Sequence, residues 1–164
     1  MENKSEYRVL FVCMGNRVRS VMAEAIFNSR ASLDNGNKLI ANSVGMIRLS
    51  GAPPAEDTAI VCSENGLDVS SHRSKQLDAG DIFASDLVLT METGQMNHLK
   101  ESFPDSSDKI FTIKGYPDTE EGDILDPYME DIKVYRERFV EINNEIDRLM
   151  SHIISEAIKL GINR

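Results

Sequence analysis

The chain has few cysteines, a shortage of positive charge and no long hydrophobic run. It contains two cysteines, Cys13 and Cys62, and no CxxC pair, so the sequence predicts neither a disulfide framework nor a zinc or thioredoxin-like site. Its 18 basic residues are outnumbered by 27 acidic ones, which gives a formal net charge of -9. Nucleic acids and anionic membranes bind basic surfaces. We therefore expect no nucleic-acid or membrane partner, and local positive groups must bind any anionic ligand.

The start of the chain is polar. Its first eight residues, MENKSEYR, lack the apolar segment of a secretory signal peptide, and no run approaches the roughly 18 to 20 apolar residues of a membrane span. We therefore expect a cytoplasmic protein in which Cys13 is a free thiol. The 164 residues suffice for one domain, 1–164, with its own hydrophobic core, whereas the oligomeric state stays open.

Short apolar runs alternate with helix-like stretches along the chain. Runs rich in valine, isoleucine and leucine are typical of buried parallel strands, and they occupy residues 8–12, 39–43, 86–91 and 109–113. Helices are expected between them, at residues 21–31, 55–65, a short one near Ser74, and 93–101. This alternation predicts a right-handed, doubly wound α/β sheet.

The last third of the chain combines a long acidic loop with a long helix. Apolar residues recur at three- and four-residue steps from about Asp131 towards Leu160, which predicts an amphipathic helix there. The preceding stretch, residues 116–131, reads YPDTEEGDILDPYMED and has no such period. Long loops in compact domains are often functional, so this loop is a candidate part of the site.

The first predicted strand leads directly into a group of reactive residues. Residues 9–20 read VLFVCMGNRVRS, so Cys13 ends the strand and a loop follows it into a helix. Ligands of open α/β sheets bind at the carboxyl ends of strands, and the free N–H groups of a helix start bind anions. Gly15 and Asn16 are residue types that tolerate the backbone angles of such a loop. We therefore expect an anion site beside a thiol.

The spacing of the reactive side chains indicates the chemistry. Thiols near helix N-termini and cations exist as thiolates at neutral pH, which makes them nucleophiles. Arg19 can return to the loop centre and offer a planar pair of donors to two phosphate oxygens, and Ser20 can hydrogen-bond the sulfur. The spaced glycines of a dinucleotide site and the Gly-Lys pair of a P-loop are both missing. The Cys-x5-Arg-Ser pattern therefore favours covalent phosphoryl transfer or related oxyanion chemistry.

At this point the chain resembles a known family, the low-molecular-weight protein tyrosine phosphatases. The similarity runs in order along nearly the whole chain, through VLFVCMGNRVRSVMAEAIF at 9–27, NSVG at 42–45, SHRSKQL at 71–77, LVLTME at 87–92 and DPY at 126–128. It implies a single three-layer α/β domain with a four-stranded parallel sheet flanked by helices. It also implies a cysteinyl-phosphate intermediate with no metal or other cofactor, and a phosphorylated protein or small phosphate ester as substrate, with inorganic phosphate as product.

The resemblance also assigns roles to individual residues. Cys13 is the nucleophile, Arg19 the phosphate clamp and Asp126 the general acid and base, with Asp118 and Asp123 as weaker candidates for the acid. The phosphate-binding loop comprises Met14, Gly15, Asn16, Arg17, Val18 and Arg19. Supporting hydrogen bonds are implied for Asn16, Ser20, Ser43 and His72, and Tyr128 forms an aromatic wall. Cys62, inside an amphipathic helix, is expected in the core.

The match departs from the family pattern at the site itself. Many members have a second cysteine where this chain has Val18, so the protective disulfide at that position cannot form. Arg17 replaces a small or aliphatic residue that helps to select substrate. Leu49 and Met129 stand where aromatic residues are frequent, which leaves Tyr128 as the aromatic wall. We expect the Arg17 side chain at the rim of the site, where it shifts recognition from ring stacking towards charge.

Three alternatives stay open on the sequence. A thiol-dependent arsenate reductase of the same fold needs further cysteines, and this chain offers Cys62. A protein-arginine phosphatase uses a threonine where Arg17 stands, and Arg17 should repel a cationic phosphoguanidine. The third alternative is a non-catalytic module that binds oxyanions or phosphoproteins. Turnover of para-nitrophenyl phosphate distinguishes that module from an enzyme.

Overall fold

A four-stranded, fully parallel sheet forms the centre of the molecule. The computed structural model describes residues 4–32, 38–118 and 121–162, so residues 119–120 of the predicted acidic loop lie outside the described residues. The strands are β1 (Tyr7–Cys13), β2 (Leu39–Gly45), β3 (Leu87–Thr90) and β4 (Ile110–Thr112), in the order β2-β1-β3-β4. The predicted α/β fold is confirmed, with each strand within a few residues of its expected position.

The strand register brings the end of the first three strands to one edge. Cys13, the last residue of β1, lies opposite Gly45, the last residue of β2. Its neighbour Val12 lies opposite Thr90, the last residue of β3. Because the strands are parallel, their carboxyl ends and the loops that follow gather at this edge. The Cys13 loop therefore meets the loops after β2 and β3.

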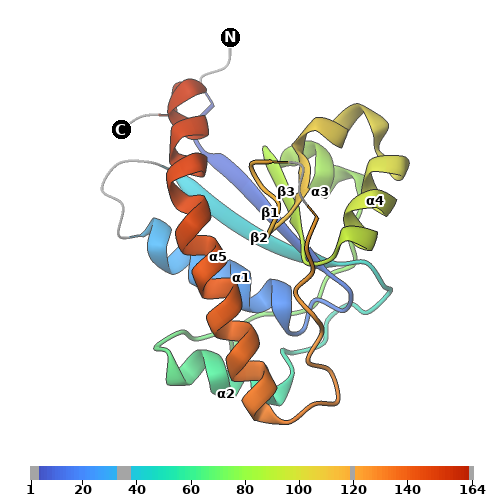
Figure 1. The fold of residues 1–164 in the computed structure, drawn as a ribbon, viewed down its shortest axis with the longest axis vertical. Helices are drawn as coiled ribbons and strands as arrows, with labels where there is room; N and C mark the ends of the chain where they lie inside the picture. The colour runs from blue at the N-terminus through green and yellow to red at the C-terminus, as the bar shows by residue number, and fades with distance from the viewer. Residues whose placement is uncertain (1–3, 33–37, 119–120, 163–164) are drawn as a thin grey trace.

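Helices cover both faces of the sheet (Figure 1). Helices α1 (Arg19–Ala31), α2 (Glu56–Glu64) and α5 (Ile132–Lys159) share one core with the β1 side chains Val9 and Phe11. Helices α3 (Ala79–Ala84) and α4 (Thr93–Ser102) share the other core with Leu10 and Val12. Successive β1 side chains thus enter opposite cores, as strand geometry requires. The result is the predicted three-layer, doubly wound arrangement.

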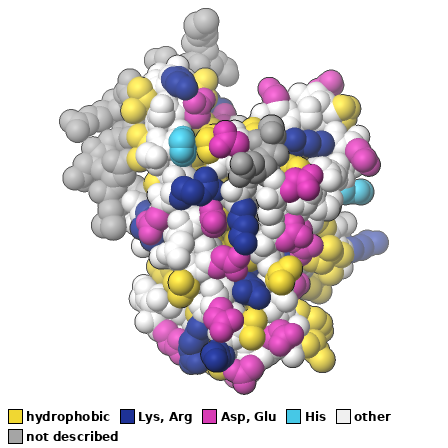
Figure 2. All heavy atoms as spheres, in the orientation of Figure 1, with side chains coloured by type: hydrophobic (Ala, Val, Ile, Leu, Met, Phe, Trp, Pro, Cys, Tyr) yellow, Lys and Arg dark blue, Asp and Glu magenta, His cyan; other side chains and the backbone are white. Residues whose placement is uncertain are grey.

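Helix α5 is the predicted long amphipathic helix. Its buried residues are Tyr135, Phe139, Ile142, Ile146, Leu149, Ile153 and Ala157. The Asp131 side chain caps its start by accepting a hydrogen bond of 2.9 Å from the Lys133 N–H. Figure 2 shows acidic and basic side chains mixed on the exposed face of the molecule on which α5 lies. Among the described helices, α5 included, none is both long and apolar enough to cross a bilayer.

The prediction of a short helix near Ser74 is wrong. Residues 72–75 form no helix, because the Ser74 backbone pairs with residue 52 instead: its N–H donates to the Ala52 carbonyl at 2.8 Å. The helix begins five residues later as α3, where Asp78 and Asp81 form a capping box. A 3-10 helix, η1 (Pro104–Lys109), which was not predicted, also precedes β4.

Candidate active site

A cavity of about 470 Å³ opens at the carboxyl edge of the sheet. Loops after β1 and β2, the start of α2, the Asp-Pro-Tyr segment and the first turn of α5 all contribute to it. Its lining residues are Cys13, Met14, Gly15, Arg17, Val18, Arg19, Ile47, Leu49, Ala55, Asp126, Tyr128, Met129 and Tyr135. The predicted nucleophile, clamp and acid therefore face one space, although Cys13 and Asp126 lie 113 positions apart in the sequence.

The Cys13 thiol lies at the bottom of this cavity. Its Sγ is 2.9 Å from Ser20 Oγ and accepts a hydrogen bond of 3.3 Å from the Asn16 N–H. The Ser20 hydroxyl and the Asn16 N–H thus hold the sulfur in place from two sides. Helix α1 begins at Arg19, and its N-cap residue Val18 provides no side-chain cap, so the N–H groups of the first turn remain free of side-chain acceptors. Such groups bind oxyanions.

The buried Asn16 side chain stabilises the conformation of the loop that follows Cys13. Asn16 is fully buried and has a φ of 54°, a left-handed conformation that asparagine tolerates better than most residues. Its Nδ2 donates to Ser20 Oγ at 2.8 Å and to Ser43 Oγ at 2.9 Å. Gly45 leaves room for this arrangement, because a Cβ there would come within 3.0 Å of the Met14 carbonyl oxygen. The conformation of the loop thus depends on the close approach of its backbone to Gly45 as well as on side-chain hydrogen bonds.

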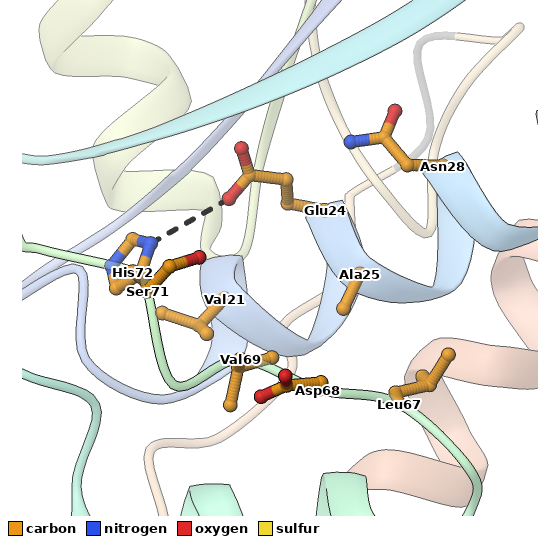
Figure 3. A pocket seen from close by; sticks show the side chains of 9 residues that line it. All are labelled: Val21, Glu24, Ala25, Asn28, Leu67, Asp68, Val69, Ser71 and His72. Carbon is orange, nitrogen blue, oxygen red and sulfur yellow. Dashed lines mark ion pairs between the residues drawn. The ribbon is translucent and has the colours of Figure 1, made fainter.

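Two further side chains extend this support network. Ser43 Oγ donates to Glu24 Oε2 at 2.8 Å, and His72 Nε2 donates to the Asn16 carbonyl oxygen at 2.9 Å. His72 Nδ1 also lies 3.7 Å from Glu24 Oε2. A second cavity, of about 340 Å³, adjoins the network at Glu24 and His72, and its lining includes neither Cys13 nor Arg19 (Figure 3). The network therefore lies between the Cys13 loop and this second space.

The charge of His72 should contribute to stability. Burial lowers its pKa, but the hydrogen bonds to Glu24 and to the Asn16 carbonyl more than offset this, so the pKa is raised above its ordinary value of about 6.5. A raised pKa means that protonated His72 stabilises the fold. This stabilisation is fully present at pH values below the ordinary pKa, and it is lost as the pH rises through the pKa of His72 in the folded protein.

His72→Gln should therefore lower the melting temperature by more at pH 6 than at pH 9. Loss of one net hydrogen bond contributes about 1 kcal/mol, which corresponds to about 2–4 °C in a chain of this size. Thermal unfolding at the two pH values measures the difference. His152→Gln, at an exposed position of α5, is the control. If the difference in melting temperature between wild type and His72→Gln stays constant or increases with rising pH, His72 does not have this role.

Arg19 is buried in the wall of the cavity, with 1% of its surface exposed. Its Nη1 donates to the Ile124 carbonyl oxygen at 2.7 Å and pairs with Glu92. Its Nη2 is 3.3 Å from Asp126 Oδ2. Several acceptors thus fix the plane of the guanidinium. Arg19 joins the Cys13 loop to the distant segment that carries Asp126.

The Asp126 segment closes the cavity on the side facing Arg19. Asp126 Oδ1 accepts a hydrogen bond of 3.1 Å from the Tyr128 N–H, which turns the chain sharply after Pro127. Tyr128 and Met129 both line the cavity and are largely exposed, Met129 by 85%. Tyr128 thus lies at the mouth with no second aromatic ring after it.

Arg17 also lines the cavity, and its guanidinium is tethered. Its Nε donates to the Pro53 carbonyl oxygen at 2.8 Å, and its own carbonyl accepts a hydrogen bond of 3.1 Å from the Ala55 N–H. These contacts fix Arg17 against the segment that precedes α2. A positive charge is therefore held at the mouth.

Sequence reasoning missed several contributors to the site, among them Ala55 at the start of α2. Glu92 follows β3 at the same sheet edge as Cys13, and its place after a strand was the available signal. Tyr135 belongs to the buried face of α5, yet it also lines the cavity. Ile47 belongs to the loop after β2, and no motif marks it. These residues enter through loop and helix packing that the local sequence does not specify.

Comparison with known proteins places the chain in a family. Residues 8–159 match the family model described as low molecular weight phosphotyrosine protein phosphatase. This chain belongs to that family. The predicted resemblance is therefore confirmed, and so is its enzyme class, because curated relatives named as low molecular weight protein-tyrosine-phosphatases also match.

Individual relatives of this low molecular weight phosphatase carry two substrate names. A protein-arginine-phosphatase of Geobacillus stearothermophilus is 35% identical over 92% of this chain and 98% of its own length. The low molecular weight protein tyrosine phosphatase structure from T. tengcongensis is 38% identical, with a TM-score of 0.84, covering 90% of this chain and 99% of that one. A YwlE arginine phosphatase mutant with a phosphorylated active site serine is 27% identical, with a TM-score of 0.83, over 89% and 95% of the two chains.

The second cysteine does not join this phosphatase site. Cys62 is buried in α2, and burial raises the pKa of its thiol to about 12. A raised pKa favours the protonated thiol over the nucleophilic thiolate, and Cys62 does not line the cavity that contains Cys13. Arsenate reduction through these two cysteines is therefore disfavoured, and Cys62 packs in the core as expected.

Proposed function

We propose that the protein is a cysteine-dependent phosphatase that hydrolyses phosphotyrosine-type phosphate monoesters. The single observation that carries this proposal is the shared cavity of Cys13, Arg19 and Asp126. A thiol, an arginine and a carboxyl group in one space can attack, clamp and protonate a phosphate ester. The phosphate loop and its buried support network complete the arrangement.

In the first step, the Cys13 thiolate attacks phosphorus and forms a sulfur–phosphorus bond. The bond from phosphorus to the leaving oxygen breaks, and Asp126 donates its proton to that oxygen. The loop N–H groups and Arg19 bind the phosphoryl oxygens and stabilise their charge in the transition state. The products of this step are a cysteinyl-phosphate and the dephosphorylated alcohol.

In the second step, the Asp126 carboxylate takes a proton from water, and the water oxygen attacks phosphorus. The sulfur–phosphorus bond breaks, inorganic phosphate leaves, and Cys13 returns as a thiolate. The Ser20 hydroxyl, 2.9 Å from Sγ, stabilises the departing sulfur. The phosphorylated active site serine in the related mutant structure supports a covalent intermediate at this position.

Activity against a substrate panel tests the proposal. We expect turnover of para-nitrophenyl phosphate and of phosphotyrosine peptides, and little turnover of phosphoserine peptides, because the short serine side chain keeps the phosphate close to the peptide backbone. Arsenate reduction is assayed alongside. Binding of phosphate without any turnover would instead support the non-catalytic module.

Protein-arginine phosphatase activity is the second candidate, because the 35% identical Geobacillus stearothermophilus relative bears that name. A phosphoarginine side chain carries a cationic guanidinium group, and Arg17 presents a like charge at the mouth. Like charges brought together oppose binding. We therefore place phosphotyrosine ahead of phosphoarginine, and a phosphoarginine peptide in the same panel compares the two directly.

Arg17 should select substrates by charge. We expect wild type to prefer phosphotyrosine peptides with acidic flanking residues over neutral ones by up to about fivefold in kcat/KM at low salt, since an exposed ion pair contributes about 0.2–1 kcal/mol. Arg17→Ile should lose this preference. Kinetics on paired peptides at low and high salt measure it, and salt should shrink it through screening.

The matched control is Arg8→Ile, which removes the same charge from the opposite end of β1. This variant should keep the acidic-flank preference of wild type. If wild type and Arg17→Ile show equal ratios, Arg17 plays no part in substrate choice.

A further inference from the structure

The segment between β4 and α5 carries Asp126 but contains no helix or strand among its described residues. Its described part after the gap, residues 121–131, runs beside α5 (Figure 1). Ile124 and Pro127 in this part are buried, whereas Leu125 and Asp126 between them are exposed, Leu125 by 60%. Apolar packing therefore fixes the residues on either side of the Leu125–Asp126 peptide unit and leaves the unit itself to polar contacts.

One arginine of α5 contacts this peptide unit. Arg138 Nε donates a hydrogen bond of 2.9 Å to the Leu125 carbonyl oxygen. That carbonyl belongs to the same planar unit as the Asp126 nitrogen, so holding it restricts rotation of the whole plane. The plane in turn sets the direction in which the Asp126 side chain leaves the backbone. The contacts of the carboxylate itself, at 3.1 Å to the Tyr128 N–H and 3.3 Å to Arg19 Nη2, are longer.

Arg138 is itself held in place by its neighbours. Its Nη1 lies 3.3 Å from Glu141 Oε2, and Glu141 Oε1 pairs with Lys114 Nζ at 2.6 Å. Lys114 lies at the start of the same segment, and its side chain packs so closely against Gly122 that a Cβ at Gly122 would come within 3.0 Å of it. The Arg138 side chain is 20% exposed. Arg138 and Glu141 of α5 and Lys114 of the segment thus form one partly buried network of charged groups.

We propose that Arg138 is a positioning residue for Asp126, acting through the Leu125 carbonyl. The inference rests on the proposed function, in which Asp126 transfers protons to and from the reacting oxygens. Without Arg138, the Leu125–Asp126 peptide unit rotates more freely, and the carboxyl group spends less time where it reaches the leaving oxygen. Phosphate binding and attack by Cys13 do not depend on this contact.

Arg138→Met tests the proposal, because methionine keeps much of the aliphatic stem and removes every donor. We expect kcat/KM to fall on the order of tenfold for phosphate esters with poor leaving groups, since small misplacements of a reacting group can cost up to about 10²-fold. For esters with good leaving groups the change should stay below about twofold, because these need no proton. The plot of log kcat/KM against leaving-group pKa therefore becomes steeper, while inhibition by inorganic phosphate is unchanged.

Three further variants separate positioning from general stability. Arg136→Met removes a neighbouring arginine of α5 that pairs with Glu64 on α2, and it should keep the wild-type slope. Arg138→Lys retains a donor, so its slope of log kcat/KM against leaving-group pKa should lie between those of wild type and Arg138→Met. In the Asp126→Ala background, Arg138→Met should not steepen the slope further, because no acid remains to be positioned.

The outcomes distinguish this inference from the proposed function. A wild-type slope in Arg138→Met beside a steep slope in Asp126→Ala overturns the positioning role and leaves the proposed function intact. Equal steepening in Arg136→Met also overturns it, because the effect would then belong to α5 as a whole. A wild-type slope in both Arg138→Met and Asp126→Ala overturns the assignment of Asp126, and the positioning role falls with it.

Discussion

Cys13→Ser is expected to lose turnover of para-nitrophenyl phosphate by on the order of 10⁴-fold or more while still binding inorganic phosphate. The serine hydroxyl is a far weaker nucleophile than a thiolate at neutral pH. The loop N–H groups and Arg19 remain, so the anion site persists. Steady-state kinetics measures the first effect, and calorimetric titration with phosphate or vanadate measures the second.

The matched control uses the other cysteine. Cys62→Ala changes a buried core thiol of α2 and should keep wild-type turnover even if it lowers the melting temperature. Rapid acid quenching should trap a phosphocysteine on wild type and on Cys62→Ala, and none on Cys13→Ser. Appreciable turnover by Cys13→Ser would remove Cys13 from the role of nucleophile.

Asp126→Ala should show the second large loss, and the loss should depend on the substrate. General acid catalysis contributes about 10²- to 10⁴-fold, and this contribution is needed most when the leaving oxygen is basic. We therefore expect a large decrease in kcat/KM for alkyl and unsubstituted phenyl esters and a small one for activated nitrophenyl esters. The measurement is the slope of log kcat/KM against leaving-group pKa over a series of esters.

Asp123→Ala is the matched control in the same segment. Asp123 Oδ1 accepts a hydrogen bond of 2.7 Å from the Thr93 N–H at the start of α4, so this carboxylate has a structural partner and does not line the cavity. Its variant should keep the wild-type slope. If Asp126→Ala keeps that slope while Asp123→Ala or Asp118→Ala steepens it, the acid is one of those residues.

Much of the fold could be predicted because the apolar pattern is local and regular. The buried stripe of α5, from Tyr135 to Ala157, repeats every three or four residues, and one face of a helix needs no tertiary information to be recognised. The four strands were found as short apolar runs for the same reason. The prediction of a helix near Ser74 failed because the Ser74 backbone bonds to Ala52, a residue of an earlier loop.

The part of the site that could be predicted consists of residues that are close together in the sequence. Cys13, Asn16, Arg19 and Ser20 lie in one loop and the first turn of one helix, so their spacing alone brings them together. Glu92 and Tyr135 lie on other elements and reach the cavity only when the sheet order and the path of α5 are known. The position of Glu92 after a strand was a signal for it, but no spacing in the sequence connects either residue to Cys13.

By itself, the sequence determined the α/β alternation, the long last helix and the loop that pairs a thiol with an arginine, because each depends on neighbouring residues and fixed backbone periods. The resemblance added Asp126 as the acid. Only the tertiary structure decided that Asp126 lies 3.3 Å from Arg19, that Arg17 is tethered to Pro53 and that Arg138 holds the Leu125 carbonyl. These contacts join residues of different elements, and their geometry follows from how the sheet and helices pack together.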